Sequence, residues 1–259
     1  MSETTVDFSR LGPVPGARVV VVGGCGGIGR EVVKASVATG AKTTVLDLAL
    51  SHERHPGPNE AAFVPIDAHS EETIVSAYKE IGKDGPIDAL INLVGYRDAL
   101  HRLTDRDSAS WDDIIAGNLR SAFLICRHAL PLMADGSALV NVSSGLATRV
   151  LPGYAPYSAA KAGVIALTKG IAMENAPRVR ANAVAPAAVK TAFLAGGTGR
   201  VDEEEGDWDS EYGGYIKTIP MGRLAVPADI VGPILFLAGP ASGFMTGQVL
   251  YVNGGGLMP

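Results

Sequence analysis

The chain has 259 residues, of which 47% are hydrophobic, and a formal net charge of −5. Its length and apolar content predict one α/β domain of somewhat above average size with a buried core. The acidic balance, without any cluster of Lys and Arg, excludes a nucleic-acid partner, whose phosphates bind clustered basic side chains, and argues against an anionic membrane.

Short apolar runs and isolated cysteines indicate a protein that is made and kept inside the cell. The longest runs, such as residues 17–22 and 234–238, fall far short of the ~20 residues that span a bilayer. Residues 1–10 are polar and acidic and lack the basic and apolar regions of a signal peptide. Cys25 and Cys126 stand alone, which favours core or turn positions over a disulfide or a metal site. We therefore expect a cytoplasmic protein without a metal or a membrane partner.

Apolar, β-branched runs alternate with segments of helical spacing along most of the chain. Residues 1–16 end in glycines and prolines and are interpreted as a loose leader. The expected strands cover residues 17–22, 42–46, 61–66, 87–94, 138–142, 179–184 and the segment TGQVLYVNGG. The expected helices begin near Ile28 and then cover residues 71–81, 111–133, 155–175 and 227–237. This alternation predicts a single doubly wound, Rossmann-type domain over residues 17–259, with a parallel sheet of about seven strands and helices on both faces.

A glycine-rich loop separates the first strand from the first helix. Gly23, Gly27 and Gly29 permit a tight turn and let backbone N–H groups approach a pyrophosphate at the helix N-terminus. Such a loop alone could be a plain turn, but its place between a strand and a helix favours a dinucleotide site. The second strand ends at Asp47, whose carboxylate can accept hydrogen bonds from both ribose hydroxyls and repels a 2′-phosphate. We therefore predict NAD rather than NADP as the cofactor.

The segment from Ser144 to Lys161 is expected to carry the chemistry. Ser144 follows a buried strand, and Tyr157 and Lys161 lie one turn apart on a helix, so their side chains share a face. A proton shuttle near neutral pH needs the tyrosine pKa lowered from ~10 by roughly two to three units, and a cation about 4 Å away supplies ~4 kcal/mol at an effective dielectric of ~20. Lys161 is therefore predicted to lower the pKa of Tyr157 in a largely dry site. The alternative is a surface Tyr and Lys on an ordinary amphipathic helix.

These residues resemble the short-chain dehydrogenase/reductase family, in which a serine precedes the tyrosine of Tyr-x-x-x-Lys by the 13 residues that separate Ser144 from Tyr157. The resemblance implies that Tyr157 is the general acid/base and that Ser144 orients the reacting oxygen. It implies that Lys161 tunes Tyr157 and holds the cofactor ribose. Asn118 matches the helix asparagine that, in this family, holds a water bound to the lysine.

Three further motifs extend the resemblance over residues 17–255. The loop after the first strand has the form G-x-x-x-G-x-G, NLVG stands where the family reads NNAG, and NAVAPAAVKT resembles N-x-V-x-P-G-x-V-x-T, with Ala187 in place of the family's glycine. The cofactor-binding residues that we expect on this basis are Gly23, Gly27, Ile28, Gly29, Asp47, Asp67, Ala68, Asn92, Gly95, Tyr157, Lys161, Pro186, Val189 and Thr191.

The expected substrate region is mostly apolar. Its lining is predicted to include Tyr96, Leu146, Tyr154 and Ala187, which favours a hydrophobic alcohol, cyclic or aromatic, over a sugar. Tyr96 and Arg97 follow the strand 87–94, so they either face the substrate or are exposed loop residues, and Arg97 could instead bind a carboxylate. Residues 192–218 contain several glycines and an acidic run. We interpret them as a lid whose apolar underside comes from Trp208, Tyr212 and Tyr215, although a disordered aromatic loop would have the same composition.

The sequence therefore predicts an NAD-dependent enzyme that moves a hydride between nicotinamide and a small-molecule secondary alcohol or ketone. The choice of NAD suggests that the reaction runs in the direction of alcohol oxidation. One alternative is a 3-oxoacyl thioester (acyl carrier protein) reductase, which would use NADPH and a basic docking surface. A second is a non-catalytic dinucleotide-sensing module. Small residues in helices 111–133 and 155–175 permit close helix contact, and the family resemblance implies a homodimer or homotetramer.

Overall fold

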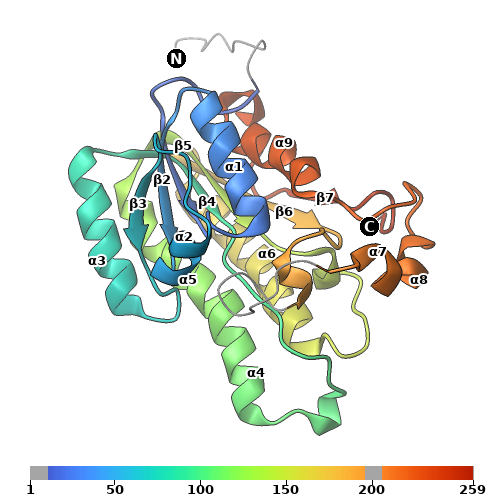
Figure 1. The fold of residues 1–259 in the computed structure, drawn as a ribbon. Coiled ribbons are helices and arrows are strands. Elements are labelled where there is room, and N and C mark those ends of the chain that lie inside the picture. Colours follow the sequence, from blue (N-terminus) through green and yellow to red (C-terminus); the bar gives the residue numbers. More distant parts are fainter. Residues whose placement is uncertain (1–10, 196–205, 259) are drawn as a thin grey trace.

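The computed structural model describes residues 11–195 and 206–258 and contains one seven-stranded sheet (Figure 1). The strands lie in the order β3-β2-β1-β4-β5-β6-β7, and every neighbouring pair is parallel. Their bounds are β1 Arg18–Val22, β2 Lys42–Asp47, β3 Ala62–Pro65, β4 Ile87–Asn92, β5 Met133–Val142, β6 Val179–Pro186 and β7 Val249–Val252. The predicted doubly wound fold is confirmed.

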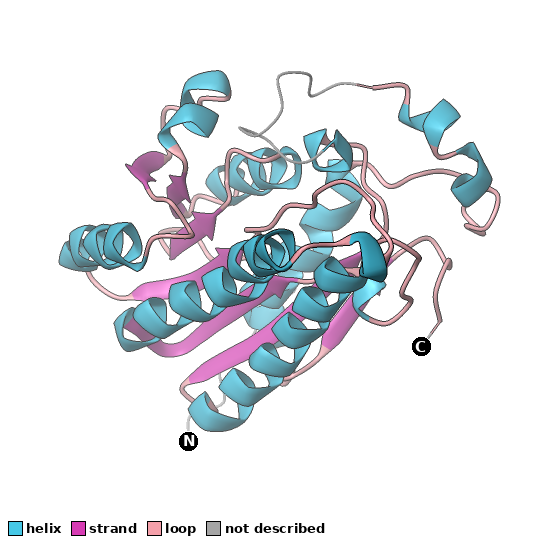
Figure 2. Ribbon diagram, turned by 90° about the horizontal axis from the view of Figure 1, so that it is seen from below, coloured by secondary structure: helices cyan, strands magenta, loops and turns pink. Residues whose placement is uncertain are grey.

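Helices cover both faces of this sheet, as Figure 2 shows. Their bounds are α1 Gly27–Ala38, α2 Ala49–Arg54, α3 Glu71–Ile81, α4 Ser108–Ile115, α5 Ser121–Ala129, α6 Ala155–Asn175, α7 Trp208–Glu211, α8 Gly213–Ile216 and α9 Pro227–Ala238. No helix in the described ranges is both long and apolar enough to cross a lipid bilayer. In Figure 1 the short helices α7 and α8 lie together near the C-terminus.

Two hydrophobic clusters fix the sheet between its helices. Strand β1 illustrates why, because successive side chains of a strand point to opposite faces. Val20 and Val22 pack with α3, α5 and α6, whereas Val19 and Val21 pack with α1 and α9. All four side chains are at most 1% exposed, which is why a central parallel strand is a continuous apolar run.

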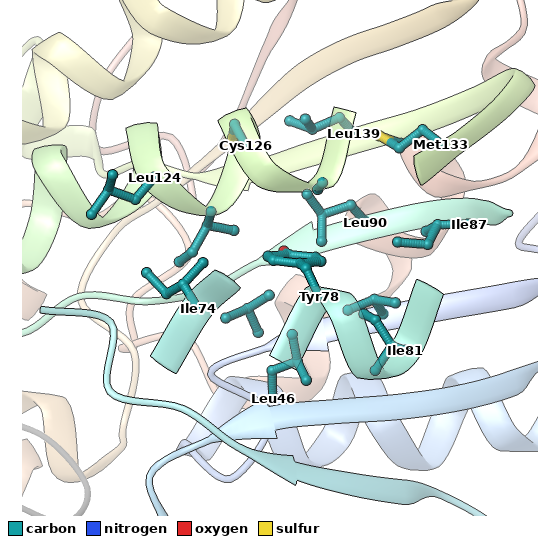
Figure 3. Packing of buried hydrophobic residues seen from close by; sticks show 14 of the residues in the cluster. Leu46, Ile74, Tyr78, Ile81, Ile87, Leu90, Leu124, Cys126, Met133 and Leu139 are labelled. Atoms are coloured by element: carbon teal, nitrogen blue, oxygen red, sulfur yellow. The ribbon is translucent and has the colours of Figure 1, made fainter. Parts of the chain in front are cut away.

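Figure 3 shows the first of these clusters, in which Tyr78 of α3 lies beside Leu90 of β4. Cys126 belongs to the same cluster, and Cys25 lies in the turn before α1. Both thiols are free and buried. The core and turn positions predicted for the two cysteines are therefore confirmed.

The predicted helix over residues 111–133 is wrong. Helix α4 ends at Ile115, a π turn covers Ala116–Arg120, and α5 ends at Ala129 before a short 3₁₀ turn that contains Pro131. Strand β5 then begins at Met133, five residues before the expected start. Met133 pairs with Ile87 of β4 and Ala138 pairs with Ala89, so the residues between Met133 and Ala138 form an irregularity in the strand. The other elements differ from the prediction by a few residues at their ends.

Candidate functional site

The described residues enclose a cavity of about 800 Å³ at the carboxyl ends of the central strands. Its lining comes from the loop between β1 and α1, the ends of β2, β4 and β5, helix α6 and the segment after β6. From β1 the chain first builds outward to β2 and β3 and then crosses to β4 on the other side. Ligands of open α/β sheets bind at such a reversal of strand order, so the fold itself favours this cavity as the site.

The glycine loop forms one end of the cavity and has no room for side chains. Gly23 has a φ of 81°, a conformation that other residues rarely adopt. A Cβ on Gly29 would lie 2.1 Å from the carbonyl oxygen of Gly23, and one on Gly27 would lie 2.4 Å from Cγ2 of Thr191. Helix α1 begins at Gly27 with no side-chain cap and no acidic residue in its first turn. Its N-terminus is therefore suited to an anionic group such as a pyrophosphate.

Asp47 is tied to this loop. Its carboxylate accepts hydrogen bonds from the backbone N–H groups of Cys25, at 2.8 Å, and Leu48, at 2.7 Å. Burial raises the pKa of Asp47, and the two N–H donors oppose that rise. The nearby His52 ring stacks on Phe63 at 3.8 Å between ring centroids and does not line the described cavity.

Ser144, Tyr157 and Lys161 meet at the centre of the cavity wall. Ser144 ends the segment after β5, and its Oγ accepts a hydrogen bond from the backbone N–H of Leu146 at 3.1 Å. Tyr157 and Lys161 lie on α6 and are 5% and 3% exposed, with Nζ of Lys161 5.8 Å from the centroid of the Tyr157 ring. A buried phenol, a hydroxyl and an amine thus lie next to the glycine loop, and the surface-pair alternative is wrong.

The predicted lowering of the Tyr157 pKa by Lys161 is wrong for the geometry observed. Burial raises the pKa of Tyr157 well above its ordinary value, although a hydrogen bond with Ser144 opposes the rise. Burial also lowers the pKa of Lys161 to about 8. The physical reason is that Nζ of Lys161 donates to the backbone carbonyls of Val142, at 3.1 Å, and Val94, at 3.4 Å, rather than to the phenol oxygen. Burial is therefore the main cause of both pKa shifts.

Asn118 lies in the π turn and is fully buried behind the cavity wall. Its Nδ2 donates to the carbonyls of Tyr96, at 2.9 Å, and Ile114, at 3.0 Å, and its Oδ1 accepts from the N–H of Tyr96 at 3.3 Å. A Cβ on Gly95 would lie 2.6 Å from Oδ1 of Asn118 and 2.8 Å from Nζ of Lys161. The missing side chain of Gly95 thus lets Asn118 and Lys161 approach the same point.

Other predicted cofactor residues divide into those that line the cavity and one that does not. Asn92 does not line it, because its amide donates to Oδ1 of Asn141 at 3.0 Å and accepts from the N–H of Val94 at 3.2 Å. Asn92 therefore holds the end of β4 against β5 and supports the site from behind. The residues that do line the cavity are Gly23, Gly27, Ile28, Gly29, Asp47, Asp67, Ala68, Gly95, Tyr157, Lys161, Pro186, Val189 and Thr191.

All four predicted substrate residues line the cavity, but Tyr96 forms a fixed wall. It is 6% exposed, and its hydroxyl donates to the carbonyl of Asp113 at 2.9 Å. Its ring packs so closely on the π turn that a Cβ on Gly117 would lie 2.1 Å from it. The remaining substrate residues that line the cavity are Leu146, Tyr154 and Ala187.

Sequence reasoning missed several residues of this wall. The Phe193 ring lies 5.6 Å from the Tyr157 ring, centroid to centroid, and Arg149 and Leu257 also line the cavity. Phe193 lies within the expected lid over residues 192–218, where an aromatic beside the matched Thr191 was an available signal. Of that segment, residues 196–205 lie outside the described part of the chain. Tyr212 and Tyr215 line the cavity from the region of α7 and α8.

Comparison with known proteins gives the same family for sequence and structure. Residues 23–256 match the family model described as enoyl-(acyl carrier protein) reductase. The chain is 33% identical over 254 residues to the 3-oxoacyl-[acyl-carrier-protein] reductase FabG of Chlamydia pneumoniae, covering 93% of this chain and 96% of that protein. It is 32% identical over 259 residues to galactitol 2-dehydrogenase (L-tagatose-forming) of Cereibacter sphaeroides, covering 96% and 98%.

Among solved structures, a short-chain dehydrogenase/reductase from Brucella melitensis, titled glucose/ribitol dehydrogenase, superposes with a TM-score of 0.82. The two chains share 27% sequence identity, and the match covers 96% of this chain and 99% of that one. The range matched by the family model includes the glycine loop, the serine and the Tyr-x-x-x-Lys helix. The chain therefore belongs to the short-chain dehydrogenase/reductase family of oxidoreductases.

Proposed function

We propose that this protein is an NAD-dependent dehydrogenase or reductase that interconverts a small secondary alcohol and its ketone. The observation that carries the proposal is the meeting of Ser144, Tyr157 and Lys161 in one cavity wall beside the glycine loop. A nicotinamide dinucleotide supplies or accepts the hydride when it is bound. The chain itself supplies the hydrogen bonds and the proton transfer at the substrate oxygen.

The glycine loop supports binding of a dinucleotide. Gly29 packs directly on the loop backbone, where a Cβ would lie 2.1 Å from the Gly23 carbonyl oxygen. This tight turn and the uncapped start of α1 form a cradle in which backbone N–H groups can face phosphate oxygens. Pro186 at the end of β6, and Val189 and Thr191 in the segment after it, are the proposed nicotinamide contacts. Asp67 and Ala68 are the proposed contacts at the adenine end.

Asp47 supports NAD over NADP. Two backbone N–H groups each occupy one position on its carboxylate oxygens, which leaves further lone pairs for ribose hydroxyls. The same negative charge repels a 2′-phosphate. His52, whose ring is stacked on Phe63, does not offer a compensating cation in the cavity.

Tyr157 is the proposed acid and base at the reacting oxygen. Its raised pKa keeps the buried phenol protonated at neutral pH, so it can donate a proton to the oxygen of a ketone. In the reverse direction, the phenolate left by that donation is the form that accepts the proton of the alcohol. Ser144 adds a hydroxyl that can hydrogen-bond the same oxygen as negative charge develops on it. Lys161, whose pKa is near 8, carries charge through much of the neutral range and is the proposed link between Tyr157 and the cofactor ribose. Asn118 is the proposed support for that lysine, because the two side chains converge at Gly95.

The test is Tyr157→Phe, which removes only the hydroxyl. We expect NADH binding, followed by fluorescence, to be kept, while turnover of a secondary alcohol falls by about 10²- to 10⁴-fold, the usual contribution of a general acid or base. Tyr78→Phe is the matched control, since it removes a buried hydroxyl that has no hydrogen-bond partner among the described residues and lies in the core rather than the cavity. Full activity of Tyr157→Phe would exclude this mechanism.

A second candidate is a 3-oxoacyl thioester reductase. The name of the Chlamydia pneumoniae relative favours it, and the description of the matched family model also names an acyl carrier protein substrate. Asp47 argues against it, because such a reductase is expected to use NADPH. Comparing turnover with NADH and NADPH separates the two functions. A sensing module without catalysis would instead bind NADH and give no turnover with any alcohol.

The family also motivates a proposal on assembly. Small residues of α6 and of the α4–α5 region would permit close contact between two copies, in a homodimer or homotetramer. Phe123, at 43% exposed, and Met173, at 85% exposed, are apolar side chains on this side of the molecule. Light scattering at several protein concentrations measures the molecular mass and tests the proposal.

A further inference from the structure

We propose that the substrate carries a carboxylate that is bound by Arg97, so that the enzyme acts on an apolar hydroxy acid or oxo acid. This inference rests on the proposed function, because it concerns the substrate half of the same cavity. Arg97 directly follows Tyr96, in the segment that leaves the carboxyl end of β4, and it lines the cavity. It is the only residue of that lining, within the described ranges, with a buried side-chain nitrogen that lacks a partner.

The guanidinium of Arg97 is poorly satisfied by the protein. Its Nε is buried without a hydrogen-bond partner among the described residues. The one hydrogen bond found for the side chain runs from Nη1 to the carbonyl of the next residue, Asp98, at 3.3 Å. A guanidinium has five N–H donors, and leaving a buried charged donor unpaired costs about 1–3 kcal/mol or more. An anionic group in the cavity would satisfy these donors.

The nearest acidic side chain in sequence is already occupied. Both carboxylate oxygens of Asp98 accept hydrogen bonds from Arg106, whose side chain is 2% exposed. Arg106 also donates to the carbonyl of Ala99 and to Oγ of Ser110. This network fixes the segment that carries Arg97 and removes Asp98 as its ion-pair partner, so Arg97 makes no ion pair with the residues that the structure describes.

The cation faces the reacting end of the cavity. Burial raises the pKa of Tyr157 and of Tyr212, and the positive charge of Arg97 opposes the rise at both hydroxyls. The charge of Arg97 therefore affects the hydroxyl of Tyr157 on one side of the cavity and the hydroxyl of Tyr212, beside α8, on the other. A substrate whose carbinol lies at Tyr157 would place a carboxylate a few bonds away within reach of this charge.

The remaining walls define the rest of the ligand. The apolar and aromatic residues around this end of the cavity are Leu146, Leu151, Tyr154, Phe193, Tyr212 and Tyr215. Arg149 donates to the carbonyl of Gly256 at 2.6 Å and Lys161 to two carbonyls, and neither has a buried side-chain nitrogen without a partner among the described residues. Asp113 also lines the cavity and makes no ion pair with Arg97 within the described structure. The single guanidinium of Arg97 matches the charge of a carboxylate more closely than that of a phosphate, which carries about −1.5 to −2 near pH 7.

The experiment compares substrates that differ in charge alone. Aromatic α-, β- and γ-hydroxy acids, beginning with mandelate, are each paired with the neutral carboxamide, beginning with mandelamide, and one phosphorylated aromatic alcohol is added. Initial rates are measured with NAD and NADP for wild type, Arg97→Met and Arg97→Lys. Arg102→Met is the matched control, because Arg102 is an exposed residue of the same segment that does not line the cavity.

We expect kcat/KM of the best acid to exceed that of its amide by about 10- to 100-fold, the range for hydrogen bonds to a charged group. Arg97→Met should remove this preference through KM of the acid while leaving NADH affinity unchanged, and Arg97→Lys should recover part of it because the charge remains without the planar fork. Equal kcat/KM for acid and amide, a preference for the phosphate, or an acid preference that survives in Arg97→Met overturns the inference and leaves the proposed function standing.

A binding measurement distinguishes failure of the proposed function from failure of the proposed carboxylate binding. The thermal midpoint of the NADH-saturated enzyme is measured with each acid and each amide. A rise with acids alone that is lost in Arg97→Met supports the inference even where NADH formation is not seen, whereas the same rise with acids and amides contradicts it. Absence of turnover for every pair, with this acid-specific rise, counts against the proposed function and not against carboxylate binding.

Discussion

Replacement of Lys161 by Met is expected to stabilise the folded protein at neutral pH. Lys161 is 3% exposed, and burial lowers its pKa from 10.5 to about 8. At a pH where the lysine of the unfolded chain is protonated, that difference lowers the free energy of unfolding by ~3 kcal/mol. The hydrogen bonds to the carbonyls of Val142 and Val94 offset part of it, at about 1 kcal/mol each. We therefore expect a net gain of ~1–2 kcal/mol in the free energy of unfolding.

The same reasoning fixes the pH dependence. A lysine whose pKa is lower in the folded state favours the neutral form there, so the unfolded chain binds more protons between about pH 8 and 10.5. The stability of the wild type therefore rises across this window, and the full cost is present below about pH 8. The advantage of Lys161→Met should be greatest at neutral pH and should shrink as the pH approaches 10.5.

Urea unfolding followed by tryptophan fluorescence, at neutral pH and again above pH 9, measures both effects. Lys169→Met is the control, because it makes the same substitution at an exposed position of α6. A variant that is less stable than the wild type at neutral pH, or whose advantage does not change with pH, would refute the assignment of a large desolvation cost to Lys161. Turnover should be lost in either case, since Lys161 is the proposed link between Tyr157 and the cofactor ribose.

Two glycine substitutions test the close contacts around the cavity. Gly29→Ala places a Cβ 2.1 Å from the Gly23 carbonyl oxygen and should abolish NADH binding measured by fluorescence, whereas Gly170→Ala, which has nothing within 4 Å, should bind normally. Unchanged affinity of Gly29→Ala would mean that the loop can shift without loss of the cradle. Gly117→Ala places a Cβ 2.1 Å from the Tyr96 ring and should reduce the free energy of unfolding by about 1–3 kcal/mol, with partial recovery in the double variant that also carries Tyr96→Leu. A double variant no more stable than Gly117→Ala alone would show that the ring is not the obstacle.

The sheet could be predicted because its signals are local. Each central strand is a short apolar run, such as Val19 to Val22, and buried parallel strands need that composition on both faces. The glycine loop was also predictable, because positions such as Gly29 exclude any other side chain by contact with neighbouring backbone. The site residues at strand ends then follow from the rule that parallel strands present their carboxyl ends at one edge.

The break between α4 and α5 could not be predicted from local sequence. Residues 116–120 contain no proline, and the π turn is stabilised by contacts of Asn118 with Tyr96, which lies 22 residues earlier in the chain. The pKa of Tyr157 was mispredicted for a similar reason. The direction of the Lys161 amine depends on the carbonyls of Val94 and Val142, which belong to other elements. The orientation of Asn92 likewise depends on Asn141 of the adjacent strand.

The π turn also determines the direction in which the side chains of α5 point relative to those of α4. It contains one residue more than a regular helical turn, and one residue corresponds to about 100° of rotation about a helix axis. Helix α4 packs on α6 at the catalytic side, while α5 packs on α3 and β4 in the core. If residues 116–120 were wound as a regular helix, α5 would turn by about this angle, and Phe123, now 43% exposed, would face the position held by Leu124, which is 1% exposed. The length of this turn, and not only its composition, is therefore under structural constraint.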